Sequence, residues 1–185
     1  EISRKDIRVG DTVVIEKGGE VIPKVVESVK EERTGAEKPF KMPHKCPECG
    51  GPVAQAQDEV AVRCENLSCP AQVKRRIRHF AGREAMDIEN LGTQITDQLV
   101  EKGLVKDYAD LYSLTVPAVA ELERMAEKSA LNLIEAVKAS KSRPLGALIF
   151  ALGIRHVGVT VAGLLAQKYD SLDALSRAPE GELKE

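Results

Sequence analysis

Near its start the chain alternates between apolar and polar residues, as half-buried β-strands do. Two such runs, residues 12–15 and 21–26, flank a Lys-Gly-Gly-Glu segment in which Gly18 and Gly19 are expected to adopt the positive φ angles of a tight turn. Pro23 lacks an amide proton, so it suits an edge strand or a bulge. The pattern therefore predicts a β-hairpin. Because an isolated hairpin is only marginally stable in water, we expect it to belong to a small barrel whose other strands come before the first residue.

The pattern changes after the hairpin and again after the last cysteine. Residues 31–45 are charged and contain prolines, which predicts a linker. From Gln72 onward the apolar residues recur at helical spacing, beginning with Val73, Ile77 and Phe80. The other faces of this first helix are strongly basic. Either they form a solvated face or they contact phosphate, and the contacting cations would be Lys74, Arg75, Arg76 and Arg78.

The helical part repeats one motif: a helix, a short turn with a small residue, and a second helix. The turns fall in residues 88–92, 122–126 and 152–158. Such a turn exposes the free amides of the next helix start, where the helix dipole also favours an anion. Several in register along one face match successive phosphates of a duplex without reading its bases. The alternative is a helical bundle whose glycines only permit close packing.

The groups expected to bind phosphate lie in or just after these turns: Gly92, Lys128, Ser129, Arg155, His156 and Gly158. For His156 a packing role is the alternative. The second copy is expected to be the weakest, because Arg124 and Ala126 stand where the other copies suggest glycine. Side chains there would reduce access to the amides.

The chain has four cysteines, in a C-x2-C and then a C-x4-C spacing: Cys46, Cys49, Cys64 and Cys69. Four thiolates fill the tetrahedral shell of zinc and leave no position for a catalytic water, so we expect a structural zinc site. Two disulfides or four free thiols are the alternatives, but the sequence lacks the marks of a small secreted scaffold. His44 lies close to the first pair and is expected on the surface, since four cysteines already complete the site.

Composition narrows the range of functions. The formal net charge is −2, so only local clusters of cations support contact with nucleic acid. Aromatic residues make up 3% of the chain, which counts against a surface that stacks unpaired bases. No apolar run could cross a bilayer and no signal peptide is visible, so we expect no membrane partner and a cytoplasmic location. The chain starts at Glu1 without an initiator Met, which is typical of a piece of a larger protein.

In this order the motifs resemble bacterial NAD-dependent DNA ligases. The resemblance covers nearly the whole chain and rests on the hairpin with Asp-Thr-Val and Val-Ile-Pro-Lys-Val, on Cys-Pro-Glu-Cys-Gly, Cys-Glu-Asn and Cys-Pro-Ala-Gln, and on Met-Asp-Ile, Glu-Lys-Ser-Ala and Gly-Ile-Arg-His-Val-Gly. It implies a multidomain α+β fold. Its parts would be the end of an oligonucleotide-binding (OB-fold) β-barrel in residues 1–40, a small four-cysteine zinc finger in 41–72, and a mainly α-helical helix-hairpin-helix domain in 73–185, cut before its fourth hairpin is complete.

The resemblance also implies a function. Members of this family seal nicks: a lysine takes AMP from NAD, the AMP passes to the 5′-phosphate, and the 3′-hydroxyl displaces it. The lysine belongs to a Lys-x-Asp-Gly motif that this sequence lacks, so we expect no catalytic residue here and expect NAD and magnesium to bind outside this chain. The expected role is to hold nicked double-stranded DNA by its phosphates, as a monomer, in DNA replication and repair. The alternatives are a non-catalytic DNA-repair or junction-binding module and a zinc-stabilised protein-interaction scaffold.

Overall fold

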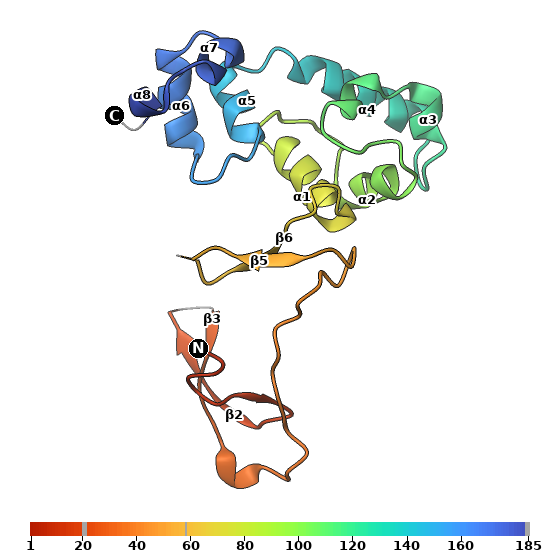
Figure 1. Ribbon diagram of the computed structural model, residues 1–185. Helices are drawn as coiled ribbons and strands as arrows, with labels where there is room; N and C mark the ends of the chain where they lie inside the picture. The colour runs from red at the N-terminus through yellow and green to blue at the C-terminus, as the bar shows by residue number, and fades with distance from the viewer. Residues whose placement is uncertain (20–21, 58, 184–185) are drawn as a thin grey trace. The chain divides into compact units, whose positions relative to one another are not determined.

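The computed structural model describes residues 1–19, 22–57 and 59–183, and the chain divides into two compact units, residues 1–45 and 46–185 (Figure 1). The first unit is built from short strands. The second contains a small hairpin followed by helices. Within the described ranges, no helix combines the length and the apolar character that a membrane span requires.

An antiparallel hairpin forms the centre of the first unit. β2 (Val13–Gly18) pairs with β3 (Ile22–Ser28), as the alternation predicts, and the register shifts between Val14 and Ile15. Gly19 has the expected positive φ of 73°, but the prediction for Gly18 is wrong, because Gly18 ends β2. A Cβ on Gly18 would lie 3.2 Å from the carbonyl oxygen of Ile22, so the close approach of the strands explains this glycine. The remaining turn positions, 20 and 21, lie outside the described residues.

The linker predicted for residues 31–45 is wrong in its first part. The 3-10 helix η1 (Lys30–Glu32) follows β3, and β4 (Lys38–Pro39) pairs antiparallel with β1 (Arg8–Val9). These residues therefore belong to the first unit. Arg33 in this segment forms ion pairs within the unit, as described below. A pattern of polar residues does not show which partner a charge has.

The second unit starts with the cysteines and a two-stranded antiparallel sheet of β5 (Val53–Gln55) and β6 (Val62–Cys64). The helices follow: α1 (Pro70–Phe80), α2 (Thr93–Glu101), the 3-10 helix η2 (Asp110–Ser113), α3 (Val116–Ala120), α4 (Glu127–Ser140), α5 (Leu145–Ala151), α6 (Val159–Lys168), α7 (Leu172–Ser176) and α8 (Glu180–Leu183).

The helices pack in sequential pairs, α1 with α2, α3 with α4, and α5 with α6 (Figure 1). The apolar residues predicted to share one face of α1 are all buried there. They join a core shared by the first two pairs, whose fully buried side chains include Ile77, Leu99, Leu111, Val119 and Leu133. The first connection is longer than the short turn predicted, because residues 81–92 make tight turns of their own between α1 and α2. The predicted order of strands, cysteine cluster and helices is confirmed.

Candidate zinc centre and hairpin sites

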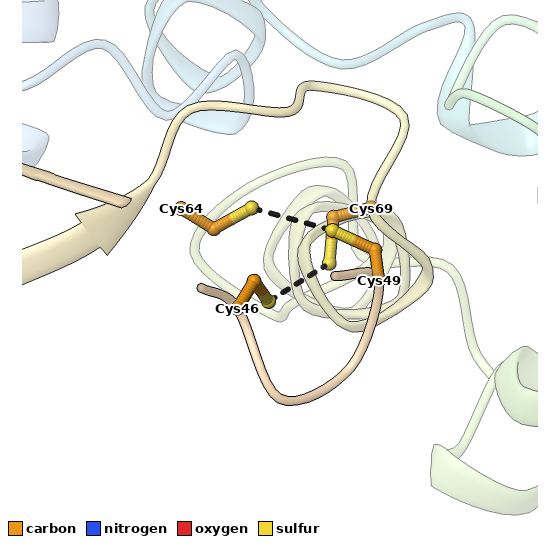
Figure 2. A group of neighbouring side chains, drawn as sticks. All are labelled: Cys46, Cys49, Cys64 and Cys69. Atoms are coloured by element: carbon orange, nitrogen blue, oxygen red, sulfur yellow. Dashed lines mark hydrogen bonds between the residues drawn. The ribbon is translucent and has the colours of Figure 1, made fainter. Parts of the chain in front are cut away.

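The four cysteines meet at one point, as Figure 2 shows. Their sulfur atoms all lie within 4.8 Å of one another, and none of the four thiols is in a disulfide. Zinc with Zn–S bonds of about 2.3 Å would place tetrahedral sulfurs about 3.8 Å apart, so the cluster fits one zinc ion after small adjustments. The disulfide alternative is thereby excluded. His44 is exposed and is not a member of the cluster, in agreement with the surface position predicted for it.

The first cysteine pair is held by a turn built on two glycines. Gly50 has a φ of 69°, and hydrogen bonds from Gly50 N to Cys46 O (2.9 Å) and from Cys46 N to Gly51 O (2.8 Å) close the turn. The Gly51 amide donates to the sulfur of Cys49 at 3.4 Å, and this bond helps to lower the pKa of that thiol to about 7. A Cβ on Gly51 would lie 3.3 Å from the same sulfur. The turn thus stabilises a thiolate, which is the form that binds zinc.

The second pair joins the metal site to the helical part. Cys64 ends β6, and Cys69 is the residue immediately before α1, with only 1% of its surface exposed. Burial raises the pKa of Cys69, while the backbone amides of Gln72 and Ala71, in the first turn of α1, donate hydrogen bonds to it and oppose that effect. A helix N-terminus favours negative charge, so the start of α1 supports a thiolate bound to zinc.

The three predicted turns have the same backbone conformation. Asn90, Arg124 and His156, each two residues before the N-cap of the following helix, have φ angles of 66°, 61° and 66°. In each turn the residue just before the N-cap donates a backbone hydrogen bond to the residue three positions earlier, at 3.5, 3.1 and 3.1 Å. Positive φ is rare outside glycine, so its recurrence at equivalent positions indicates one motif present three times.

The helices after these turns begin without side-chain caps. Their N-cap residues Gly92, Ala126 and Gly158 are all extended, with φ between −76° and −90°, and across the described chain no side chain bonds the amides of these three helix starts. α1, α3 and α5 also lack a side-chain cap, whereas α7 is capped by the hydroxyl of Ser171, which accepts a bond from Ala174 N. The three turns therefore leave the first amides of α2, α4 and α6 free to bind an external acceptor.

The glycines at two of the N-caps are not explained by the fold. Neither Gly92 nor Gly158 has positive φ, and a Cβ on either would have no atom of the described residues within 4 Å. Ala126 has the same backbone conformation, so alanine is compatible with the geometry of the turn. The predicted difference between alanine and glycine at this position is therefore one of access to the helix amides. Space left open in front of free amides suits the close approach of another molecule.

The side chains expected beside these turns are accessible. Lys128, Ser129, Arg155 and His156 are all exposed, so the packing role considered for His156 does not apply. Arg155 already has a partner, because its Nη2 forms an ion pair with the carboxylate of Glu59 in the β5–β6 connection.

Some cations on the basic face of α1 form ion pairs within the protein. The ammonium of Lys74, 17% exposed, lies 2.6 Å from a carboxylate oxygen of Glu101 and 3.8 Å from one of Asp97, and Arg78 pairs with Asp97 as well. Both acids belong to α2, so these two cations join the helices of the first pair. Arg75, in contrast, is exposed and has no carboxylate partner in the described residues.

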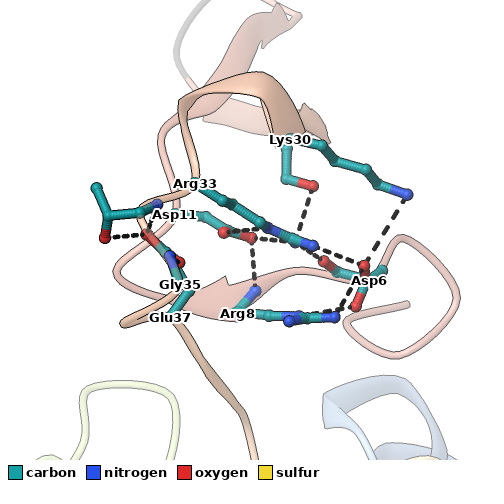
Figure 3. Close-up of polar contacts among 9 residues, drawn as sticks. Asp6, Arg8, Asp11, Lys30, Arg33, Gly35 and Glu37 are labelled. Atoms are coloured by element: carbon teal, nitrogen blue, oxygen red, sulfur yellow. Dashed lines mark hydrogen bonds and ion pairs between the residues drawn. The ribbon is translucent and has the colours of Figure 1, made fainter.

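The sequence interpretation missed an ion-pair network in the first unit, shown in Figure 3. The guanidinium of Arg33 donates to both carboxylate oxygens of Asp11 at 2.7 Å and to Asp6 Oδ2 at 2.8 Å, while Arg8 N donates to Asp11 Oδ2 at 2.8 Å. The Asp11 side chain is 0% exposed. Hydrogen bonds from Arg33 lower the pKa of Asp11 to about 2. Because Arg33 lies 22 residues from Asp11, no local spacing reveals this pair.

Comparison with known proteins explains this combination of parts. Residues 1–37 match the model of the NAD-dependent DNA ligase OB-fold domain, residues 45–71 that of the NAD-dependent DNA ligase C4 zinc finger domain, and residues 147–185 that of a helix-hairpin-helix motif. The chain contains domains of the NAD-dependent DNA ligase family. The resemblance drawn from its motifs is confirmed, as are the OB-fold, zinc-finger and helix-hairpin-helix assignments and the structural zinc.

Curated relatives are similar to the chain along nearly its whole length. A protein named DNA ligase from Geobacter sulfurreducens is 55% identical over 99% of the chain, and another from Halothermothrix orenii is 54% identical over 99%. A third, from Heliobacterium modesticaldum, is 55% identical over 99% of the chain. The chain spans only about a quarter of these relatives, 27%, 28% and 27% of their lengths.

Proposed function

We propose that this chain is the DNA-holding portion of an NAD-dependent DNA ligase, and that it grips nicked double-stranded DNA through the phosphate backbone. The observation that carries this proposal is the pair of N-cap glycines, Gly92 and Gly158, which leave open space in front of unpaired helix amides. A phosphate oxygen placed there would accept hydrogen bonds from these amides and interact favourably with the helix dipole. Such contacts do not depend on base sequence, which suits an enzyme that must act at any nick.

Cationic side chains around the hairpins would add to this grip. Lys128 and Ser129 lie in the first turn of α4, and Arg155 and His156 lie in the turn before α6. On α1 we assign phosphate contact first to Arg75 and Arg76, since Lys74 and Arg78 already pair with acids of α2. In this scheme the backbone amides fix the position of the phosphates, and the local cations neutralise them, so the chain needs no high net positive charge.

The chemical steps would take place elsewhere in the intact enzyme. NAD and magnesium would bind outside this chain, because the sequence has no Lys-x-Asp-Gly motif to accept AMP. Incubation of the chain with NAD and magnesium, followed by intact-mass measurement, should therefore show no AMP adduct. An adduct of that mass would refute this part of the proposal.

We place the zinc finger at residues 41–72 and the helix-hairpin-helix domain at residues 73–185. In this proposal, zinc replaces a hydrophobic core in a segment too small to fold unaided, and the chain acts as a monomer.

The deciding experiment measures binding to labelled duplexes that are intact, nicked or branched, over a series of salt concentrations. We expect affinity to fall steeply as salt rises, because phosphate contacts release counterions, and we expect the nicked duplex to bind at least as well as the intact one. An affinity for DNA that did not change with salt concentration would refute binding through the phosphate backbone. A strong preference for branched DNA, with none for nicks, would instead favour a junction-binding module.

A further inference from the structure

A pocket of about 690 Å³ opens inside the second unit, between the zinc finger, α1 and the turn that joins α5 to α6. Its wall includes Cys64 and Cys69 on one side and residues of the α5–α6 turn, such as Gly153 and Val157, on the other. His79 forms part of the wall, and its Nε2 lies 2.8 Å from the carbonyl oxygen of Phe150, which ties α1 to α5 at the edge of the pocket.

The charged side chains that line this pocket are all cationic. They are Arg63 from β6, Arg75 and Arg76 from α1, and Arg155 from the α5–α6 turn. No Asp or Glu is among the described residues of the lining. Such a concentration of guanidinium groups in one hollow creates a positive potential and favours a bound anion.

Internal anions neutralise part of this charge. Glu59 pairs with both Arg63 and Arg155. A zinc ion held by four thiolates would add two formal negative charges on the cysteine side. Against four arginines these anions leave about one positive charge unmatched, which fits a single phosphate group better than a polyphosphate.

Of the four arginines in the lining, Arg75 and Arg76 of α1 have no carboxylate partner among the described residues. Arg75 is exposed, and nowhere in the described chain does an acid lie within ion-pair distance of either residue. Arg76 donates from Nη2 to the carbonyl oxygen of Leu67, but its Nε is buried and has no acceptor in the part of the chain that the structure describes. These guanidinium groups therefore retain donors that a phosphate could satisfy.

We propose that this pocket binds one phosphodiester phosphate of a DNA strand, through Arg75 and Arg76 with help from Arg63 and Arg155. The proposal rests on the proposed function but adds a contact that the hairpin amides do not make. It also gives the zinc finger a direct part in DNA binding, since β6 and three of the four zinc ligands, Cys46, Cys64 and Cys69, line the pocket.

The test uses the whole zinc-loaded chain with Arg75→Gln, which removes an exposed cation that has no carboxylate partner among the described residues. Lys138→Gln is the matched control, because Lys138 is exposed on α4 and lies outside the pocket. In duplex-binding titrations we expect Arg75→Gln to weaken binding about five- to tenfold and to lower the slope of log affinity against log salt by about one relative to the control. Equal slopes for the two variants would overturn the proposal.

A second measurement identifies the ligand. Arginine Nε–H signals in NMR spectra are followed during titration with a short oligothymidylate, which carries only diester phosphates, and separately with inorganic phosphate. We expect the oligonucleotide to shift the signals of Arg75 and Arg76. Shifts with inorganic phosphate alone would identify a site for free phosphate and overturn the DNA assignment. So would a change that is confined to zinc affinity.

The two proposals fail in different ways. If the hairpin amides do not bind DNA, alanine at Gly92 and Gly158 will leave duplex affinity unchanged while Arg75→Gln still reduces it. If the pocket does not bind DNA, the glycine variants will weaken binding and Arg75→Gln will behave like Lys138→Gln.

Discussion

Replacing Gly92 and Gly158 with alanine should weaken DNA binding while leaving the fold intact. Both residues have φ values, −76° and −86°, that alanine adopts freely, and within the described ranges a Cβ at either position would meet no atom within 4 Å. The second hairpin already carries alanine at the equivalent position, Ala126, with φ −90°. The substitutions therefore place a methyl group in front of the helix amides and change little else.

The expected effects on stability and on binding differ in size. Alanine restricts the unfolded chain, which stabilises by about 0.4–1 kcal/mol, but it is a poorer N-cap than glycine by a similar amount, so we expect a net change within about 1 kcal/mol. A hydrogen bond to a charged group contributes about 1.5–3 kcal/mol. If the methyl group removes most of one such bond, each substitution should lower duplex affinity by about five- to thirtyfold.

The assay combines thermal unfolding of each variant with fluorescence anisotropy on a labelled nicked duplex. Ala126→Gly is the matched reverse variant, and it should raise affinity because it opens the weakest of the three hairpins. The reasoning would be refuted if the alanine variants unfolded at the wild-type temperature and bound DNA equally well. A large loss of stability would also refute it, because the space around both glycines would then not be open.

Three other predictions concern the zinc, the ion-pair network and the helical core. Removing zinc with a chelator should disorder the cysteine segment and weaken DNA binding, as circular dichroism and anisotropy would show, and restoring zinc should reverse both effects; DNA affinity that survived chelation would contradict this. The pKa of Asp11 is lowered to about 2 by its hydrogen bonds from Arg33, so the stability it contributes is complete above about pH 4 and is lost as the pH falls toward 2. Asp11→Asn should lower the melting temperature at neutral pH and flatten this acid dependence in a pH series of melts, whereas an unchanged profile would count against the network. In α4, Leu133 is 0% exposed and Leu131 is 45% exposed. Leu133→Ala should cost about 2–5 kcal/mol in denaturant unfolding and Leu131→Ala less than about 0.5, and similar values for the two would disprove the assigned core.

Local patterns predicted much of this protein. The cysteine spacing alone indicated the metal cluster, because the ligands of each pair are neighbours in the chain and need only a tight turn to meet. Alternation and helical periodicity located the hairpin and the buried face of α1 for the same reason, since both depend on residues a few positions apart.

The second helix-hairpin-helix turn is closer to the other two than its residue types suggested. Arg124 and Ala126 suggested a defective second copy, yet Arg124 adopts the same positive φ as Asn90 and His156. Backbone hydrogen bonds and the packing of α3 against α4 stabilise that conformation enough to offset its cost of about 1–2 kcal/mol for a residue other than glycine. A residue type alone does not reveal how strongly its surroundings constrain it.

The partners of the charged residues could not be predicted from the order of residues in the chain. A run of cations looks the same in the sequence whether it meets DNA, water or an acid elsewhere in the chain. Folding placed Asp97 and Glu101 of α2 beside Lys74 and Arg78. It left Arg75 without a carboxylate partner among the described residues. It also buried the Asp11 side chain in an ion pair with Arg33. Metal ligands and helix faces follow from short spacings along the chain, whereas the partner of each charge depends on contacts between distant segments, and those contacts exist only in the tertiary structure.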